Sequence, residues 1–467
     1  MKKIFWIVWL FLTLCLLLFW GYKVIVSKDK SQLLIGEGSH GHYQIEMSCE
    51  SCHTSSFSSK EDLQLACVNC HGDELKLVDD THPRSKFTDP RNADRTAVLD
   101  ARFCVTCHTE HQKEYTLDMG LTIPGDFCFH CHQDIAEERP SHKNLEYDTC
   151  ASAGCHNFHD NTALYEDFLL KHANEPAQKP GALLFDLVAA KVELMASNKK
   201  ASLTAKNQNM PNGVDALYDK ALVERATHEW DGSAHANAGV NCLDCHSEGG
   251  EEGERDTQIK WVAKPDHLIC ANCHVNQAEG FYAGKHGMRV SPYLEVQQTP
   301  LKPKMSTLAF KDSSLQLEHG CNACHGAHAY DINEAAVDGC LVCHDDEHSR
   351  NYKSSTHYSL WQQELKGELE SGQGVSCASC HMPRKKIIEN GKTLVQVEHN
   401  QNAYYQPNEK MVRPVCMHCH GLGFVLDSLA DKVLIEKNFH GSPGLHVPSI
   451  DWALFRENIQ GETNENN

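Results

Sequence analysis

The chain has 467 residues, of which 23 are cysteine and 31 are histidine, and its formal net charge is −20 at pH 7. This acidity excludes nucleic acid as a partner, because phosphate binding needs basic patches. A chain so rich in cysteine is stapled by disulfides, loaded with metal or loaded with haem, and the cysteine spacing decides among the three.

The N-terminus has the composition of a membrane segment. An apolar run from Ile4 to Trp20 follows two lysines, and Tyr22 lies just beyond it. The run is longer than the roughly 7–15 residues of a signal core, and no small-x-small cleavage site follows. Aromatic residues such as Trp20 and Tyr22 suit the lipid–water interface. We therefore expect residues 1–28 to be a single uncleaved span in a bacterial inner membrane, with the rest of the chain in the periplasm. A cleaved secretory signal is the alternative.

Cysteine spacing is the strongest pattern in the chain. Apart from Cys15 in the apolar run, every cysteine belongs to one of eleven pairs, and a histidine follows each pair directly. Ten pairs read C-x-x-C-H, and the eleventh has four intervening residues. The pairs are Cys49/Cys52, Cys67/Cys70, Cys104/Cys107, Cys128/Cys131, the wider Cys150/Cys155, Cys242/Cys245, Cys270/Cys273, Cys321/Cys324, Cys340/Cys343, Cys377/Cys380 and Cys416/Cys419.

This spacing suits covalent haem attachment. Two thiols on one turn reach the two vinyl groups of a porphyrin, and the next histidine points at the iron. A structural zinc site does not require the adjacent histidine, and a thioredoxin-like pair needs one motif rather than eleven. We predict eleven c-type haems, with proximal ligands His53, His71, His108, His132, His156, His246, His274, His325, His344, His381 and His420.

The remaining 20 histidines supply candidates for the sixth iron ligand. A second histidine makes the iron six-coordinate, the state suited to outer-sphere electron transfer. His111, His159 and His328 each lie three residues after a motif histidine, so one short segment can serve two haems. His130 and His418, inside their motifs, can likewise reach a neighbouring haem. For each candidate the alternative is a solvated loop histidine. The distal candidates are His42, His82, His111, His142, His159, His235, His286, His319, His328, His357 and His399.

The motifs fall into two groups. Five lie before residue 157 and six after residue 241, and an apolar pattern at helical spacing lies between them over 183–194. We expect a mainly α protein with extensive loop and little sheet, in which haems form much of the core. It would have two lobes besides the N-terminal transmembrane helix. The expected segments are a pentahaem lobe (40–172), a haem-free helical connector (173–225), a hexahaem lobe (226–450) and a disordered tail (451–467).

The first lobe resembles cytochrome modules of the c7/c3 type. The resemblance rests on the tight motif spacing, on the Cys-His-Thr-Glu-His run from Cys107 to His111, and on the long-spaced motif at Cys150. It implies a compact module of closely packed c-type haems.

The second lobe is similar to the octahaem hydroxylamine oxidoreductase and tetrathionate reductase superfamily. The runs that carry this similarity are 230–235, 239–246 and 374–383, the last ending in Cys-His-Met-Pro. Enzymes and plain electron carriers share a haem core in that superfamily. This chain departs from the enzymes because every motif ends in histidine rather than lysine, and no tyrosine follows His420 for a cross-link to the catalytic haem.

Two functions follow from these patterns. The first is a membrane-anchored electron conduit between a quinol-oxidising or other membrane donor and a periplasmic or outer-membrane acceptor. The alternative is a reductase of a small nitrogen or sulfur compound such as nitrite, hydroxylamine or tetrathionate. For the reductase, Asp266 and His267 form the candidate acid–base pair, and Arg289 is the candidate anion ligand.

Overall fold

The computed structural model describes residues 2–27, 30–55, 58–117, 120–139, 142, 157–160, 166–181, 219–248, 260–294, 300–306, 308–329, 331–389, 392–403 and 408–455. The wide motif of Cys150, Cys155 and His156 lies outside these ranges, as does the apolar pattern over 183–194. The expected fold class is confirmed, since 53% of the structure is helix and 3% is strand.

The chain divides into two compact units. Unit 1 comprises Met1–Ala163 and Arg289–Gln298, and unit 2 comprises Leu164–Met288 and Thr299–Asn467. Each unit is described separately below.

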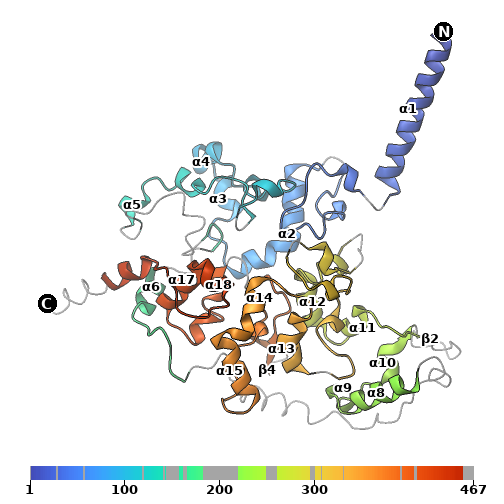
Figure 1. Cartoon of the computed structure of the whole chain (residues 1–467). Helices are drawn as coiled ribbons and strands as arrows, with labels where there is room; N and C mark the ends of the chain where they lie inside the picture. Colours follow the sequence, from blue (N-terminus) through green and yellow to red (C-terminus); the bar gives the residue numbers. More distant parts are fainter. Residues whose placement is uncertain are drawn as a thin grey trace. The chain divides into compact units, whose positions relative to one another are not determined.

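Helix α1 (Lys2–Ile25) is the longest element and buries none of its residues (Figure 1). It is long and apolar enough to cross a membrane, and a signal sequence at this position would meet the same criterion. The side chains Trp6, Trp9 and Phe19 are among those it exposes. Such a surface is stable in lipid or in a translocation channel rather than in water.

The rest of unit 1 consists of short helical pieces. The longest is α2 (Lys60–Leu77), which begins at a capping box in which Asp62 N donates to Ser59 Oγ and Ser59 N donates to Asp62 Oδ2. The other α-helices are α3 (Arg84–Thr88), α4 (Ala93–Val98) and α5 (Ile135–Glu138), and the 3-10 turns are η1 (Ser31–Leu33), η2 (Cys49–Ser51), η3 (Pro90–Asn92), η4 (Cys104–Thr106), η5 (Lys113–Tyr115) and η7 (Phe127–His130). The turn η11 (Met288–Val290) lies at the boundary of the two units.

Unit 2 holds most of the helices. Its α-helices are α6 (Glu166–His172), α8 (Lys220–Asp231), α9 (Ala234–Asn237), α10 (Cys242–His246), α11 (His267–Ala271), α12 (Val275–Ala283), α13 (Ile332–Leu341), α14 (Glu347–Asn351), α15 (Thr356–Leu365), α16 (Cys377–His381), α17 (Leu422–Ala430) and α18 (Lys432–Glu436). Its 3-10 turns are η12 (Pro303–Met305), η13 (Asp312–Ser314), η14 (Cys321–Ala323), η15 (Tyr352–Ser354), η16 (Asn408–Met411) and η17 (Cys416–His418). Residues 449–455, where we expected disorder from 451 onward, are helical, and Ile450 and Ala453 are buried.

In the described part of the chain, the strands form two antiparallel pairs, both in unit 2. Strand β1 (Ser247–Glu248) pairs with β2 (Lys260–Trp261), and β3 (Arg384–Glu389) pairs with β4 (Lys392–Val397) from Arg384 opposite Val397 to Glu389 opposite Lys392.

Apolar packing among side chains is limited. One core cluster in unit 2 consists of Val337, Tyr352 and Trp361, and the Tyr352 hydroxyl donates to the Val375 carbonyl at 2.7 Å. Leu422 and Val425 of α17 are almost completely buried. Some motifs lie within helices, as in α10 and α16, and others form 3-10 turns, as in η4 and η14.

Candidate metal centres

Seven described motifs close into the same backbone turn. In each, the carbonyl of the first cysteine accepts hydrogen bonds from the amides of the second cysteine and of the histidine that follows. For Cys104 these two N–O distances are 3.1 and 2.9 Å. Residues three and four apart on a helical turn share one side, so both thiols and the imidazole project together. The seven motifs begin at Cys49, Cys104, Cys128, Cys270, Cys321, Cys340 and Cys416.

The described motif cysteines differ in exposure. Cys52, Cys70 and Cys273 are exposed, Cys343 is buried, and the others are partly buried. Attachment of haem at all of these cysteines is a prediction from their spacing.

The backbone around Cys70, Cys131 and Cys273 suits haem attachment. Cys70 lies inside α2, where residues three apart share one face. The amides of Cys131 and Cys273 each donate to the carbonyl of the first cysteine of their motif at 3.2 Å. Each thiol is thus on the same side as its partner thiol, and its exposure leaves room for a porphyrin edge.

Nine motif histidines each face a second histidine. Their ring centroids lie between 5.8 and 6.5 Å apart, and the angles between ring planes range from 20° to 89°. The pairs are His53–His111, His71–His42, His132–His82, His246–His328, His274–His235, His325–His399, His344–His286, His381–His348 and His420–His357.

This spacing fits an iron atom between the two rings. A metal–imidazole bond is about 2 Å long, so two bonds in line separate the bound nitrogens by about 4 Å. Adding about 1 Å from each nitrogen to its ring centre places the centroids about 6 Å apart. The nine pairs share this separation although the angles between their ring planes differ widely. Direct packing of one ring on another would not by itself produce one common separation at such different angles. The residues present therefore fit a haem iron with two axial histidines.

The second ring nitrogen of many of these histidines has a protein partner. Metal-bound histidines usually donate their other N–H to a carbonyl or a carboxylate, which fixes the tautomer. Because a carbonyl only accepts, a histidine whose Nδ1 faces one carries its proton there and leaves Nε2 for the metal. Carbonyl partners are Phe158 for His82 (2.6 Å), Gly120 for His108 (3.0 Å), Gly36 for His111 (3.1 Å), Val262 for His246 (2.7 Å), Val397 for His399 (2.9 Å), Ala177 for His420 (2.9 Å) and Ile435 for His348.

Burial keeps several of these rings neutral. Loss of water contact lowers the pKa of His286 to about 3 and the pKa of His357 and His381 to about 4. A neutral imidazole is the form that binds a metal.

Two segments connect different centres. His108 belongs to its own motif, whereas His111, three residues later, faces His53 of another motif. In unit 2, His325 faces His399 and His328 faces His246. Each segment therefore lies between two candidate irons.

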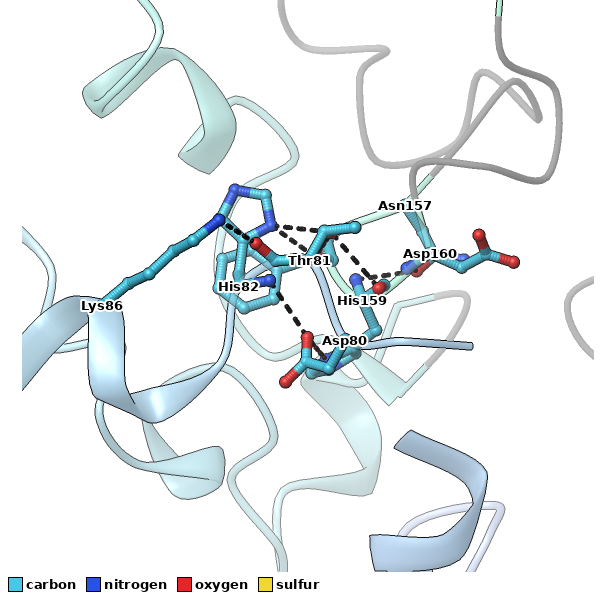
Figure 2. A network of polar contacts seen from close by, with 8 residues as sticks. Asp80, Thr81, His82, Lys86, Asn157, His159 and Asp160 are labelled. Atoms are coloured by element: carbon cyan, nitrogen blue, oxygen red, sulfur yellow. Dashed lines mark hydrogen bonds and ion pairs between the residues drawn. The ribbon is translucent and has the colours of Figure 1, made fainter. Parts of the chain in front are cut away.

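Figure 2 shows a polar network that holds two further distal candidates, His82 and His159. Asp80 Oδ1 accepts from the His82 amide at 3.1 Å and lies 3.2 Å from His159 Nδ1. The Thr81 amide donates to the His159 carbonyl at 3.0 Å, and Lys86 Nζ donates to the Thr81 carbonyl. Burial is the largest cause of the lowered pKa of His108, and the nearby His159 lowers this pKa further. Asp80 therefore positions two candidate ligands together.

Three histidines depart from the expected arrangement. His348 of α14 faces His381, although no pattern in the sequence marked it. His319, a predicted distal ligand, instead stacks on His286 with centroids 4.9 Å apart and ring planes 15° apart. The backbone amide of His142 donates a hydrogen bond to the Arg139 carbonyl.

The residues suggested for oxyanion chemistry lie in different units. Asp266 is the N-cap of α11, and its carboxylate accepts from the Leu268 amide at 2.8 Å. His267 Nε2 is buried without a hydrogen-bond partner among the described residues, next to Phe281 and Tyr282. Arg289 belongs to unit 1, where its Nη1 donates to the Gln44 carbonyl at 2.8 Å.

Comparison with known families gives one match. Residues 41–133 match the model of the family described as cytochrome c3, and this segment contains the motifs from Cys49 to His132. No curated protein and no solved structure matches the chain. The family binds c-type haem and transfers electrons. The similarity of residues 226–450 to the octahaem superfamily remains a prediction.

Proposed function

We propose that this multihaem c-type cytochrome carries eleven haems and conducts electrons between a donor in the bacterial inner membrane and a periplasmic or outer-membrane acceptor. The observation that supports this most strongly is the set of nine opposed histidine pairs at the spacing of a doubly ligated iron. Two strong ligands leave no position for a substrate on the iron, which favours outer-sphere electron transfer over catalysis.

The protein's own residues would hold and orient the haems. Each bound haem iron supplies one-electron chemistry by alternating between the ferric and ferrous states. The cysteine pairs fix the porphyrin edge, and the two histidines fix the iron from both sides. The carbonyls behind the rings hold each imidazole in one tautomer, so little rearrangement accompanies a change of oxidation state.

Neighbouring motifs are also in direct contact. The Cys104 thiol raises the pKa of Cys67, the Cys321 thiol raises that of Cys270, and the Cys377 thiol raises that of Cys340, so the thiols of each pair lie close together. Porphyrins attached to these neighbouring cysteines would be close to one another, and the segments His108–His111 and His325–His328 would join further centres. This supports a continuous electron path within each unit.

No observation favours the reductase alternative. Asp266 is occupied as a helix cap, and Arg289 donates to the Gln44 carbonyl within unit 1. Helix α1 supports attachment to the membrane by its length and exposed apolar surface.

The test combines a haem count with low-temperature EPR of the fully oxidised protein. Intact mass should show eleven haems, and EPR should show only low-spin ferric signals. A high-spin signal worth one haem would overturn the conduit and direct the search to nitrite, hydroxylamine or tetrathionate turnover.

A further inference from the structure

Carboxylates contact both rings of one histidine pair in unit 1. His42 and His71 face each other with centroids 5.8 Å apart. Glu110 Oε1 lies 2.6 Å from His42 Nδ1, and Glu74 Oε2 lies 3.2 Å from His71 Nδ1. The candidate iron of the Cys67/Cys70 motif thus has an anion behind each axial ligand.

The two carboxylates are held differently. The Ser39 amide donates to Glu110 Oε2 and the Ser39 hydroxyl donates to Glu110 Oε1, both at 2.9 Å. Glu74 lies one turn after His71 on the exposed side of α2, with 57% of its side chain accessible. Glu110 is therefore a fixed anion, and Glu74 is an accessible one that can be replaced without disturbing a core.

Three other axial candidates have neutral partners. His111 faces the Gly36 carbonyl, His82 faces the Phe158 carbonyl and His399 faces the Val397 carbonyl. A carbonyl fixes the tautomer as a carboxylate does, but it adds no charge. A carboxylate draws the Nδ1 proton toward itself, which makes the imidazole a stronger donor and favours the more positive ferric iron.

We propose that Glu74 and Glu110 are potential-setting residues, which together hold the haem of the Cys67/Cys70 motif at a lower reduction potential than haems whose histidines are backed by carbonyls alone. This inference rests on the proposed function. It assigns this centre to the low-potential part of the electron path, where electrons leave most readily.

The test is a redox titration of the full-length haem-loaded protein, followed by visible absorption and by EPR. E74Q and E110Q each remove one charge and keep a group of similar shape. Loss of an outer-shell partner typically changes metal affinity 10–100-fold. A tenfold change in the ferric–ferrous equilibrium equals about 59 mV for one electron, so each variant should raise one midpoint potential by about that amount. The double variant should raise the same midpoint further.

Glu37→Gln is the matched control. Glu37 lies in the same unit, is exposed and pairs with Lys113 Nζ at 2.7 Å, so its loss removes one charge without touching a histidine. If E74Q and E110Q move no midpoint by more than E37Q does, the inference is wrong. Since Glu74 is exposed, E74Q keeps the test valid if E110Q fails to fold. A missing haem or a high-spin signal in the wild type would instead mark failure of the proposed function.

Discussion

Two histidines lie beside the candidate iron of His344. The His286 ring faces His344 at 6.2 Å, and His319 stacks on His286 at 4.9 Å. Burial lowers the pKa of His286 to about 3 and the pKa of His319 to about 4, so both are neutral at pH 7. One iron offers only one position opposite His344. The 6.2 Å spacing assigns that position to His286, and His319 packs against the ligand.

Replacing His286 should therefore open one iron. We expect H286A to convert one haem from low spin to high spin in the EPR spectrum of the oxidised protein, whereas H319A should keep every haem low spin. A low-spin H286A protein together with a high-spin H319A protein would reverse the assignment.

His446 connects helix α17 to the helical segment 449–455 in unit 2. His446 Nδ1 lies 3.1 Å from Asp427 of α17, and His446 Nε2 lies 2.9 Å from Asp451 of the helical segment 449–455. Hydrogen bonds to the two aspartates raise the pKa of His446. The charged histidine therefore stabilises this contact fully below its ordinary pKa of 6.5, and the contribution is lost as pH rises through the raised value.

The attachment of segment 449–455 should weaken with rising pH. Amide exchange of this segment should be slowest below about pH 6 and should accelerate toward pH 9 beyond the intrinsic change. In H446Q, which cannot be protonated, the protection should be low and independent of pH. Equal pH dependence in the wild type and H446Q would show that another group is responsible.

Helix α1 decides how the molecule is retained at the membrane. If it is an uncleaved anchor, the mature protein keeps Lys2–Ile25 by intact mass and remains with membranes after a high-salt wash. Replacing α1 by a cleavable signal should release a soluble protein with the same haem content. A wild-type protein that lacks these residues and is soluble would identify α1 as a signal sequence.

Local sequence patterns predicted the motif turns and most of the histidine pairs, but not the features that depend on tertiary packing. The motif turns follow from cysteine spacing, and eight predicted distal histidines face a motif histidine in the structure. His348 was missed because it reaches His381 through tertiary packing of α14 against α18, where Asn438 Nδ2 donates to the His348 carbonyl at 3.0 Å. The β3–β4 pair was also missed, although the Asn390-Gly391 sequence between the strands is a strong hairpin signal.

At the scale of the whole molecule, side-chain burial is sparse. The largest fully buried side chains in the described residues include only three large apolar ones, Leu422, Val412 and Val425. The cluster around Trp361 is small. Conformational entropy costs of order 1–2 kcal/mol per residue must be offset by buried area, and cores this small cannot do so for a chain of this length. We expect iron held between paired histidines and buried porphyrin faces to supply the remainder.

The chain without haem should consequently fail to fold cooperatively. We expect protein produced in a host that lacks the haem-attachment machinery to lose most of its helix by far-ultraviolet circular dichroism and to show no sharp thermal transition, because both the iron cross-links and the porphyrin surfaces are missing. The haem-loaded protein, measured in the same detergent, is the control, and the apolar α1 should retain its helix in both samples. A haem-free chain that melts sharply with the full helix content would mean that the side chains alone specify the fold.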